Sequence, residues 1–110
     1  MAIAEYSDEK STVVWLRGEH DAATAGDLSE TIARAIALDR ADLIIDMSEV
    51  EFMSCATAGV LVRTQNFLRL RSRALTVRLP SSCARRVLGL CGLTGLIDET
   101  AQPMEARQIA

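Results

Sequence analysis

Few side chains in this sequence could form a catalytic triad. His20 is the only histidine, so a triad would need His20 as the base, Ser54 or Cys55 as the nucleophile and Asp46 as the third member. Nothing in the spacing supports that combination, and a histidine at the end of a strand is typical of a structural loop position. Paired acids such as Asp46 and Glu49 are typical of a solvated loop. The sequence therefore indicates no catalytic site.

Motifs for cofactors and metals are not found in the sequence either. The six glycines form neither GxGxxG nor GxxxxGK followed by Ser or Thr, so no nucleotide motif is present. The cysteines Cys55, Cys83 and Cys91 are odd in number and contain no CxxC pair, which argues against a disulfide framework and a zinc knuckle. Cys83 and Cys91 would lie about 12 Å apart along one helix, too far for a bridge. We expect no cofactor and no metal.

The start of a predicted helix within residues 46–61 (DMSEVEFMSCATAGVL) is the strongest candidate site. A buried strand leads into a short loop that carries Val50 and Phe52 inward, and Ser54 follows at the N-cap position. Free N–H groups and the helix dipole there favour an anion, so a phosphate would be tolerated locally while changing the surface charge by about −2. Two interpretations stay open: a switch, or Ser54 as only a cap and Thr57 as only a first-turn residue.

Apolar periodicity predicts the elements that must position this site. Short β-branched or continuous apolar runs predict strands at residues 12–17, 42–47 and 75–79, with residues 3–6 as a hairpin partner. Helical spacing predicts helices at residues 24–38, 55–72 and 83–91. Their predicted caps are Thr24 with Asp27, Ser54, and Ser81 or Ser82.

The apolar stripes predict which side chains face the core. On the second helix this stripe consists of Val60, Leu61, Thr64, Phe67 and Leu68; on the third it consists of Val87, Leu88 and Cys91. Strands that alternate with helices require crossover connections. The fold class is therefore α/β, with a mostly parallel sheet, the strand at residues 42–47 at its centre, and helices packed against it.

Length and composition predict one soluble domain. The 110 residues suit a single domain with a core at about residues 10–100 and a loose tail at residues 101–110. Apolar residues make up 49% and charged residues 25%, which favours autonomous folding. The first ten residues lack a signal-peptide pattern and no apolar run reaches the length of a membrane span, so we expect a cytoplasmic protein without membrane contact.

Charge is distributed unevenly along the chain. Residues 52–97 contain seven arginines and no acidic residue, whereas residues 1–51 are strongly acidic. Either the solvated faces of one domain fall this way, or the arginines line a surface for an acidic partner. Nucleic acid is disfavoured, because the aromatic content is 4% and the net charge is −3.

Four ordered segments carry a resemblance to a known family: VVWLRGEHD, DLIIDMSEVEFM, AGVL and LGLCGLTGLI. Together they resemble STAS-domain proteins, specifically the bacterial anti-sigma factor antagonists, over about residues 10–100. The resemblance implies a STAS-like fold, with a four-stranded sheet plus an added N-terminal strand, and no catalytic activity. It also implies binding to an anti-sigma factor, usually a serine kinase, which frees a sigma factor. Phosphorylation of a serine at the start of the second helix blocks that docking, and a phosphatase restores it.

The chain departs from the family at the phosphorylated position. The family pattern reads Asp-Ser-Ser/Thr-Gly-hydrophobic-Gly, and its alignment with residues 54–59 places Ala56, which has no hydroxyl, at the acceptor position. Thr57 is our first candidate for a replacement acceptor and Ser54 the second. By resemblance, the docking surface would comprise Asp21, Glu49, Ser54, Cys55, Ala56, Thr57, Gly59 and Arg63. We expect the protein to be a monomer or weak dimer.

Cys55 opens other routes. A thiol at a helix N-terminus can be oxidised, so redox control is an alternative to control by phosphate. The other interpretation is that Cys55 is only a packed cysteine in a turn of small residues. A second hypothesis is a sensory or assembly subunit of the same fold that is not phosphorylated and binds a protein or small ligand. A third is an enzyme with Cys55 as nucleophile, which lacks an identifiable base other than His20.

Overall fold

The computed structural model of the chain describes residues 2–7, 11–38 and 42–100; the predicted tail, residues 101–110, lies outside them. The strands are β1 (Ala2–Ser7), β2 (Ser11–His20), β3 (Asp42–Met53), β4 (Leu75–Arg78) and β5 (Ile97–Asp98). The helices are α1 (Ala25–Leu38), α2 (Cys55–Arg69) and α3 (Ser82–Leu90), with short 3-10 helices η1 (Ala22–Thr24) and η2 (Thr94–Leu96).

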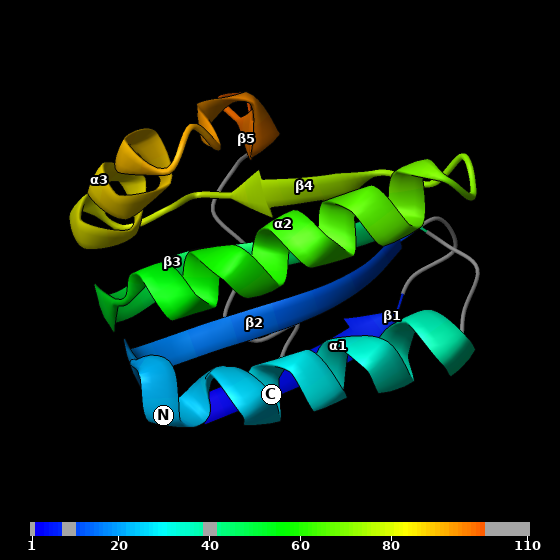
Figure 1. Cartoon of the computed structure of the whole chain (residues 1–110), viewed down its shortest axis with the longest axis horizontal. Helices are drawn as coiled ribbons and strands as arrows, with labels where there is room; N and C mark the ends of the chain where they lie inside the picture. The colour runs from blue at the N-terminus through cyan, green and yellow to red at the C-terminus, as the bar shows by residue number, and fades with distance from the viewer. Residues whose placement is uncertain (1, 8–10, 39–41, 101–110) are drawn as a thin grey trace.

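The strands form one sheet in the order β1-β2-β3-β4-β5. β1 pairs antiparallel with β2, and the other neighbours pair in parallel. Parallel neighbours need crossover connections, which α1, α2 and α3 provide (Figure 1). The predicted α/β class, the N-terminal hairpin strand and the central place of β3 are confirmed.

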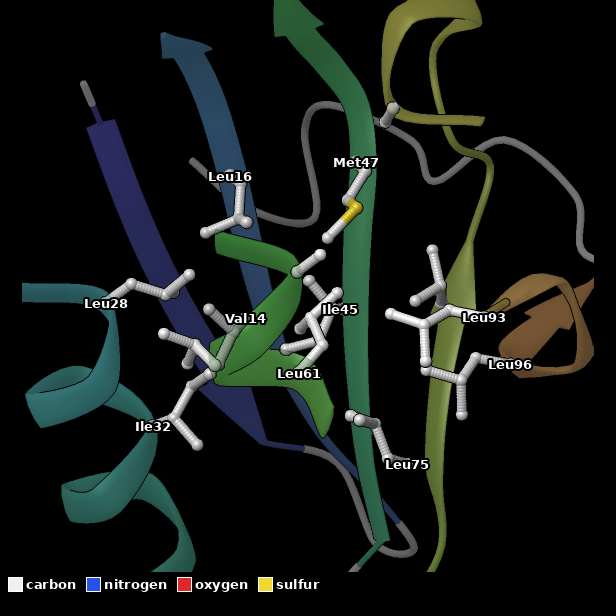
Figure 2. Packing of buried hydrophobic residues seen from close by; sticks show 14 of the residues in the cluster. Val14, Leu16, Leu28, Ile32, Ile45, Met47, Leu61, Leu75, Leu93 and Leu96 are labelled. Atoms are coloured by element: carbon white, nitrogen blue, oxygen red, sulfur yellow. The ribbon is translucent and has the colours of Figure 1, made fainter. Parts of the chain in front are cut away.

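The core lies between the sheet and the helices. Figure 2 shows Leu28 and Ile32 of α1 and Leu61 of α2 directed toward Val14 of β2 and Ile45 of β3. Each of these side chains is at most 2% exposed. Burial of one such aliphatic side chain contributes about 1.5–3 kcal/mol. The helices are therefore held on the sheet mainly by apolar contacts.

β2 and β3 both continue beyond their predicted ends, to His20 and Met53. Their pairing contains two irregularities, between Trp15 and Arg17 and between Gly18 and Glu19 of β2. At each one, β3 carries one more residue than its partner. Gly18 takes a φ of 80°, which glycine adopts without the strain that other residues meet. Because these irregularities interrupt the alternation of inward and outward side chains, the periodicity of the sequence predicts strands that are shorter than the observed ones.

Each additional residue also reverses the faces of β3, because neighbouring side chains on a strand point to opposite sides. The buried positions accordingly move from Met47 to Val50 and then to Met53. Val50 points inward as predicted, but the prediction for Phe52 is wrong: its side chain is 46% exposed. Without knowledge of the extra residue at Glu51, Val50 and Phe52 would be placed on one face.

The start of α1 also differs from the prediction. Thr24 with Asp27 does not form the predicted cap; Asp21 is instead the N-cap of η1, which leads directly into α1. The Asp21 carboxylate accepts a hydrogen bond from the Thr24 N–H at 3.1 Å. The short 3-10 turn therefore moves the cap toward the N-terminus.

The other two helices begin where the caps predict. Ser54 is the N-cap of α2, and Ser81 is the N-cap of α3, with its hydroxyl accepting from the Ala84 N–H at 3.1 Å. α2 ends at Arg69, before the predicted residue 72, in a turn where Ser72 takes a φ of 56°. Phe67, predicted to face the core, is 40% exposed.

Candidate functional site

The start of α2 is attached to the end of β2. His20 and Met53, the last residues of β2 and β3, are register partners. The backbone N–H of Ser54 donates to the His20 carbonyl oxygen at 2.9 Å, and the Thr57 hydroxyl donates to the same oxygen at 2.9 Å. The first turn of α2 is thus held at the carboxyl edge of the sheet, where open α/β sheets place their sites.

Ser54 has the extended backbone of an N-cap, with φ −93° and ψ 167°. Its hydroxyl accepts from the Thr57 N–H at 3.4 Å, which is a long hydrogen bond, and its side chain is half-buried. The predicted cap is confirmed.

Thr57 lies in the first turn, as expected, but its side chain faces inward and is 1% exposed. Its hydroxyl donates to His20 and lies 3.4 Å from the Ser54 hydroxyl. Ala56, one residue earlier and about 100° around the helix, is exposed. This burial favours Ser54 over Thr57 as an acceptor, the reverse of the order expected from spacing; modification of either hydroxyl stays a prediction.

Cys55 is the first residue of α2 and is exposed. Burial first, and the neighbouring Cys55 second, raise the pKa of the Cys91 thiol at the C-cap of α3. No local sequence pattern relates the start of one helix to the end of another, so Cys91 was not among the predicted site residues.

The acidic residues predicted for docking lie on or next to the two central strands: Asp21 directly after β2, and Glu49 on β3, four residues before its end. Asp21 is exposed and follows His20 directly, although its carboxylate also caps η1. Glu49, on β3, forms an ion pair with Arg17 at 3.7 Å, and both side chains are about half exposed. Exposed pairs of this kind contribute at most about 1 kcal/mol, so Glu49 can change partners readily.

Gly59 and Arg63 lie further along α2. A Cβ at Gly59 would meet the Arg63 guanidinium at 3.6 Å, an ordinary contact. The exposed Arg63 borders a groove of about 750 Å³ between α1 and α2. Its walls combine apolar and basic side chains, including Ile32, Ile36, Arg63, Phe67, Arg71 and Arg73.

The arginines of residues 52–97, for which the sequence left open either solvated faces or one partner-binding surface, are divided among several environments. Arg63, Arg71 and Arg73 line the groove, and Arg71 stacks over Phe67 with 3.6 Å between guanidinium carbon and ring centroid. Arg85 pairs with Glu99 at 3.0 Å. Arg78 forms an ion pair with a buried carboxylate of the sheet.

That carboxylate belongs to Asp46, which is 1% exposed. One Asp46 oxygen accepts from Nε and Nη2 of Arg78 at 3.2 and 3.1 Å, and the other accepts from Ser48 N and Oγ at 3.0 and 2.7 Å. A carboxylate held in this way is satisfied and structural. Asp46 therefore orients no histidine.

His20 is the last residue of β2 and is 1% exposed, so the expectation of a loop histidine is wrong. Its Nε2 lies 3.1 Å from the Arg17 carbonyl oxygen, and within the described residues its Nδ1 has no hydrogen-bond partner. Burial lowers the pKa of the imidazole, and the Arg17 carbonyl opposes that effect. These contacts do not link His20 to Asp46 or to a nucleophile, so the triad weighed from the sequence is not assembled.

Residues 2–7, 11–38 and 42–100 contain neither a metal-binding cluster nor a helix that could span a membrane. No cluster of three or more His, Cys, Asp or Glu side chains in them could hold a metal ion. None of their helices combines the length and the apolar character needed to cross a bilayer.

This fold and site correspond to a known class of domain. The STAS domain family model matches residues 2–106. The chain belongs to the STAS domain family. No curated protein sequence matches the chain significantly.

Solved structures narrow the similarity within that family. An anti-sigma factor antagonist from Mycobacterium paratuberculosis shares 27% identity and a TM-score of 0.81, over 90% of this chain and 86% of that one. The anti-sigma factor antagonist SpoIIAA in its unphosphorylated form shares 20% identity and a TM-score of 0.80, over 98% and 93%. A variant of RsbS from Moorella thermoacetica shares 14% identity and a TM-score of 0.62, over 100% and 85%. The last two show likeness of fold.

Proposed function

We propose that this chain is an anti-sigma factor antagonist, a non-enzymatic cytoplasmic protein that binds an anti-sigma factor and so releases a sigma factor for transcription. The observation that carries the proposal is the exposed first turn of α2, attached to the sheet through His20 and bearing a hydroxyl at its N-cap. The similarity to the mycobacterial antagonist supports it.

The docking surface would centre on Ser54, Cys55 and Ala56. Cys55 and Ala56 are exposed and Ser54 is half-buried, so a partner can reach these three residues. Asp21 directly follows β2 and Glu49 lies on β3, and both residues are exposed. Small side chains here allow close approach of a partner backbone, while the exposed aromatic ring of Phe52, just before Ser54, offers the apolar contact that interfaces favour.

Ser54 would act as the switch. A phosphate on its hydroxyl adds about −1.5 to −2 charges next to the free N–H groups of the helix, which stabilise it. The added charge would change the surface that the partner meets, so a partner adapted to the unmodified surface would bind more weakly. An anti-sigma factor of the serine-kinase type would add the phosphate, and a serine phosphatase would remove it.

The test uses the full chain and the kinase-type anti-sigma factors of its own cells. After incubation with ATP, mass spectrometry should find phosphate on Ser54 and not on Thr57. Ser54→Asp should weaken binding of the anti-sigma factor at least about tenfold, or about 1.4 kcal/mol. Ser54→Ala should bind but accept no phosphate.

Ser81→Asp is a matched control, because it places the same charge at the N-cap of α3. It should bind like the unaltered chain. If none of the anti-sigma factors binds, the proposal is wrong. If one binds equally well to Ser54→Asp, the switch is wrong, and a constitutive sensory or assembly subunit becomes the better description.

A further inference from the structure

The groove of about 750 Å³ between α1 and α2 has the size of a small-molecule site, because such sites typically measure about 300–1,000 Å³. The two helices lie side by side and run in the same direction, since each connects two parallel strands (Figure 1). On α1 the lining runs from Ser29 to Ala37, which corresponds to about 12 Å along the helix. The groove is therefore long and narrow.

The middle of the groove is apolar. Phe67 of α2 lines it with a side chain that is 40% exposed, and Ile36 of α1 lines it as a half-buried residue. Ile32, which is 2% exposed, connects this lining to the core. The other apolar lining residues are the exposed Ala33 and Ala37, whose small side chains leave space between the helices. An aliphatic chain laid here would be removed from water along its length.

Positive charge lies on the α2 side of the groove, in Arg63, Arg71 and Arg73. None of the described residues that line the groove is acidic. In the part of the chain that the structure describes, neither Arg63 nor Arg71 forms an ion pair. These two arginines lie four residues before and four residues after Phe67. The groove thus combines an apolar middle with positive ends, which is complementary to a molecule with an apolar body and an anionic group.

The guanidinium of Arg71 is held in place before any ligand binds. Its central carbon lies 3.6 Å from the centroid of the Phe67 ring, and its Nη1 donates to the Phe67 carbonyl oxygen at 3.1 Å. A guanidinium has five N–H donors in one plane, so others remain to bind a carboxylate. A side chain that is already ordered loses less conformational entropy on binding. Arg63 instead lies near Gly59, so Arg71 is the better anchor.

We propose that this groove binds a single-chain fatty acid, with the aliphatic chain along Ile32, Ile36 and Phe67 and the carboxylate on Arg71. A small ligand fits better than an acidic protein, because a standard protein interface covers about 800 Å² on each partner. The proposal does not depend on the proposed function. Neither Phe67 nor Arg71 belongs to the docking surface at the start of α2.

The first experiment titrates the full chain with decanoate, kept below its micelle-forming concentration, in a calorimeter. We expect saturable binding of one decanoate per chain. Each added methylene from hexanoate to decanoate should lower the Kd about fourfold, which corresponds to about 0.8 kcal/mol for a buried CH₂ group. Decanol has the same chain without the charge, and it should bind at least about tenfold more weakly because it makes no charged hydrogen bonds with Arg71.

Three variants locate the site. Arg71→Gln should weaken binding of decanoate at least about tenfold and change binding of decanol little. Arg69→Gln is the matched control: it removes an exposed arginine from the same segment, but Arg69 does not line the groove, so binding should be unchanged. Ala33→Leu places a larger side chain in the groove at an exposed helical position and should weaken binding of both ligands. Circular dichroism checks that each variant is folded.

Several outcomes would overturn the proposal. Decanoate that does not bind in a saturable way leaves the groove without this ligand. Binding that Ala33→Leu leaves intact, or that Arg69→Gln weakens as much as Arg71→Gln, would place decanoate elsewhere on the surface. If vesicles of an anionic phospholipid or an acidic peptide bind through Arg71 while free decanoate neither binds nor competes, the groove serves a membrane surface or a protein instead.

Discussion

Thr57 Oγ1 donates a hydrogen bond of 2.9 Å to the carbonyl oxygen of His20, so the last residue of β2 holds the first turn of α2. The same oxygen accepts from the Ser54 N–H. Two of the polar groups that begin α2 therefore converge on one atom of the neighbouring strand. The position of the exposed residues Cys55 and Ala56 depends on this junction.

Replacement of Thr57 by valine tests the junction. The change keeps the side-chain shape but removes the donor, and a buried polar interaction of this kind contributes about 1–2 kcal/mol. Thr57→Val should lower the free energy of unfolding by that amount in urea denaturation, while Thr94→Val, at an exposed position, should change little. If phosphate transfer to the chain were abolished in Thr57→Val although the protein stayed folded, Thr57 would be the acceptor after all.

The two ion pairs of β3 should differ strongly in their effect on stability. Asp46→Ala leaves the Arg78 guanidinium buried without its carboxylate, which costs about 3–5 kcal/mol. Glu49→Ala removes only the exposed pair with Arg17 and should cost less than about 1 kcal/mol. Chemical denaturation of both variants makes the comparison. Equal losses of unfolding free energy would show that burial does not determine how much these ion pairs contribute to stability.

Acidification should destabilise the fold through His20. Burial lowers the folded-state pKa of this imidazole below its ordinary value of about 6.5. As the pH falls through 6.5, the unfolded chain binds a proton that the folded chain does not yet bind, so the free energy of unfolding decreases, by at most about 1.4 kcal/mol per pH unit. The loss ends below the folded-state pKa.

His20→Gln removes the titrating group and should flatten this part of the profile. Urea denaturation between about pH 7.5 and pH 5.5 gives the slope for each chain, and slopes rather than absolute stabilities are compared, because the substitution itself disturbs a buried site. Identical slopes would assign the acid sensitivity to other groups.

Substitution by alanine should destabilise the fold at Gly18 and stabilise it at Gly26. Gly18→Ala forces a side chain into a φ of 80° at the irregular pairing of β2 with β3 and should cost about 1 kcal/mol or more. Gly26 lies in α1 with no atom within 4 Å of an added Cβ, so Gly26→Ala should stabilise the chain by about 0.5–1 kcal/mol. Thermal or urea denaturation checks both signs.

Local patterns along the chain were sufficient to predict the α/β class, the central strand and the start of α2. Helical and strand periodicities, and a cap such as Ser54, express contacts between residues close in sequence. The resemblance in the ordered segments predicted the family. These features can be read from spacing because the forces that produce them act within one element.

Tertiary structure alone decided the rest. Each of two extra residues in β3 reversed its faces, which left Phe52 exposed, and no local pattern marks such a bulge. Thr57 could be placed in the first turn from the sequence, but its burial depends on the neighbouring strand. The influence of Cys55 on the pKa of Cys91 depends on how α2 packs against α3. Which side chains of separate elements meet is set by register and packing, which connect residues far apart in the chain.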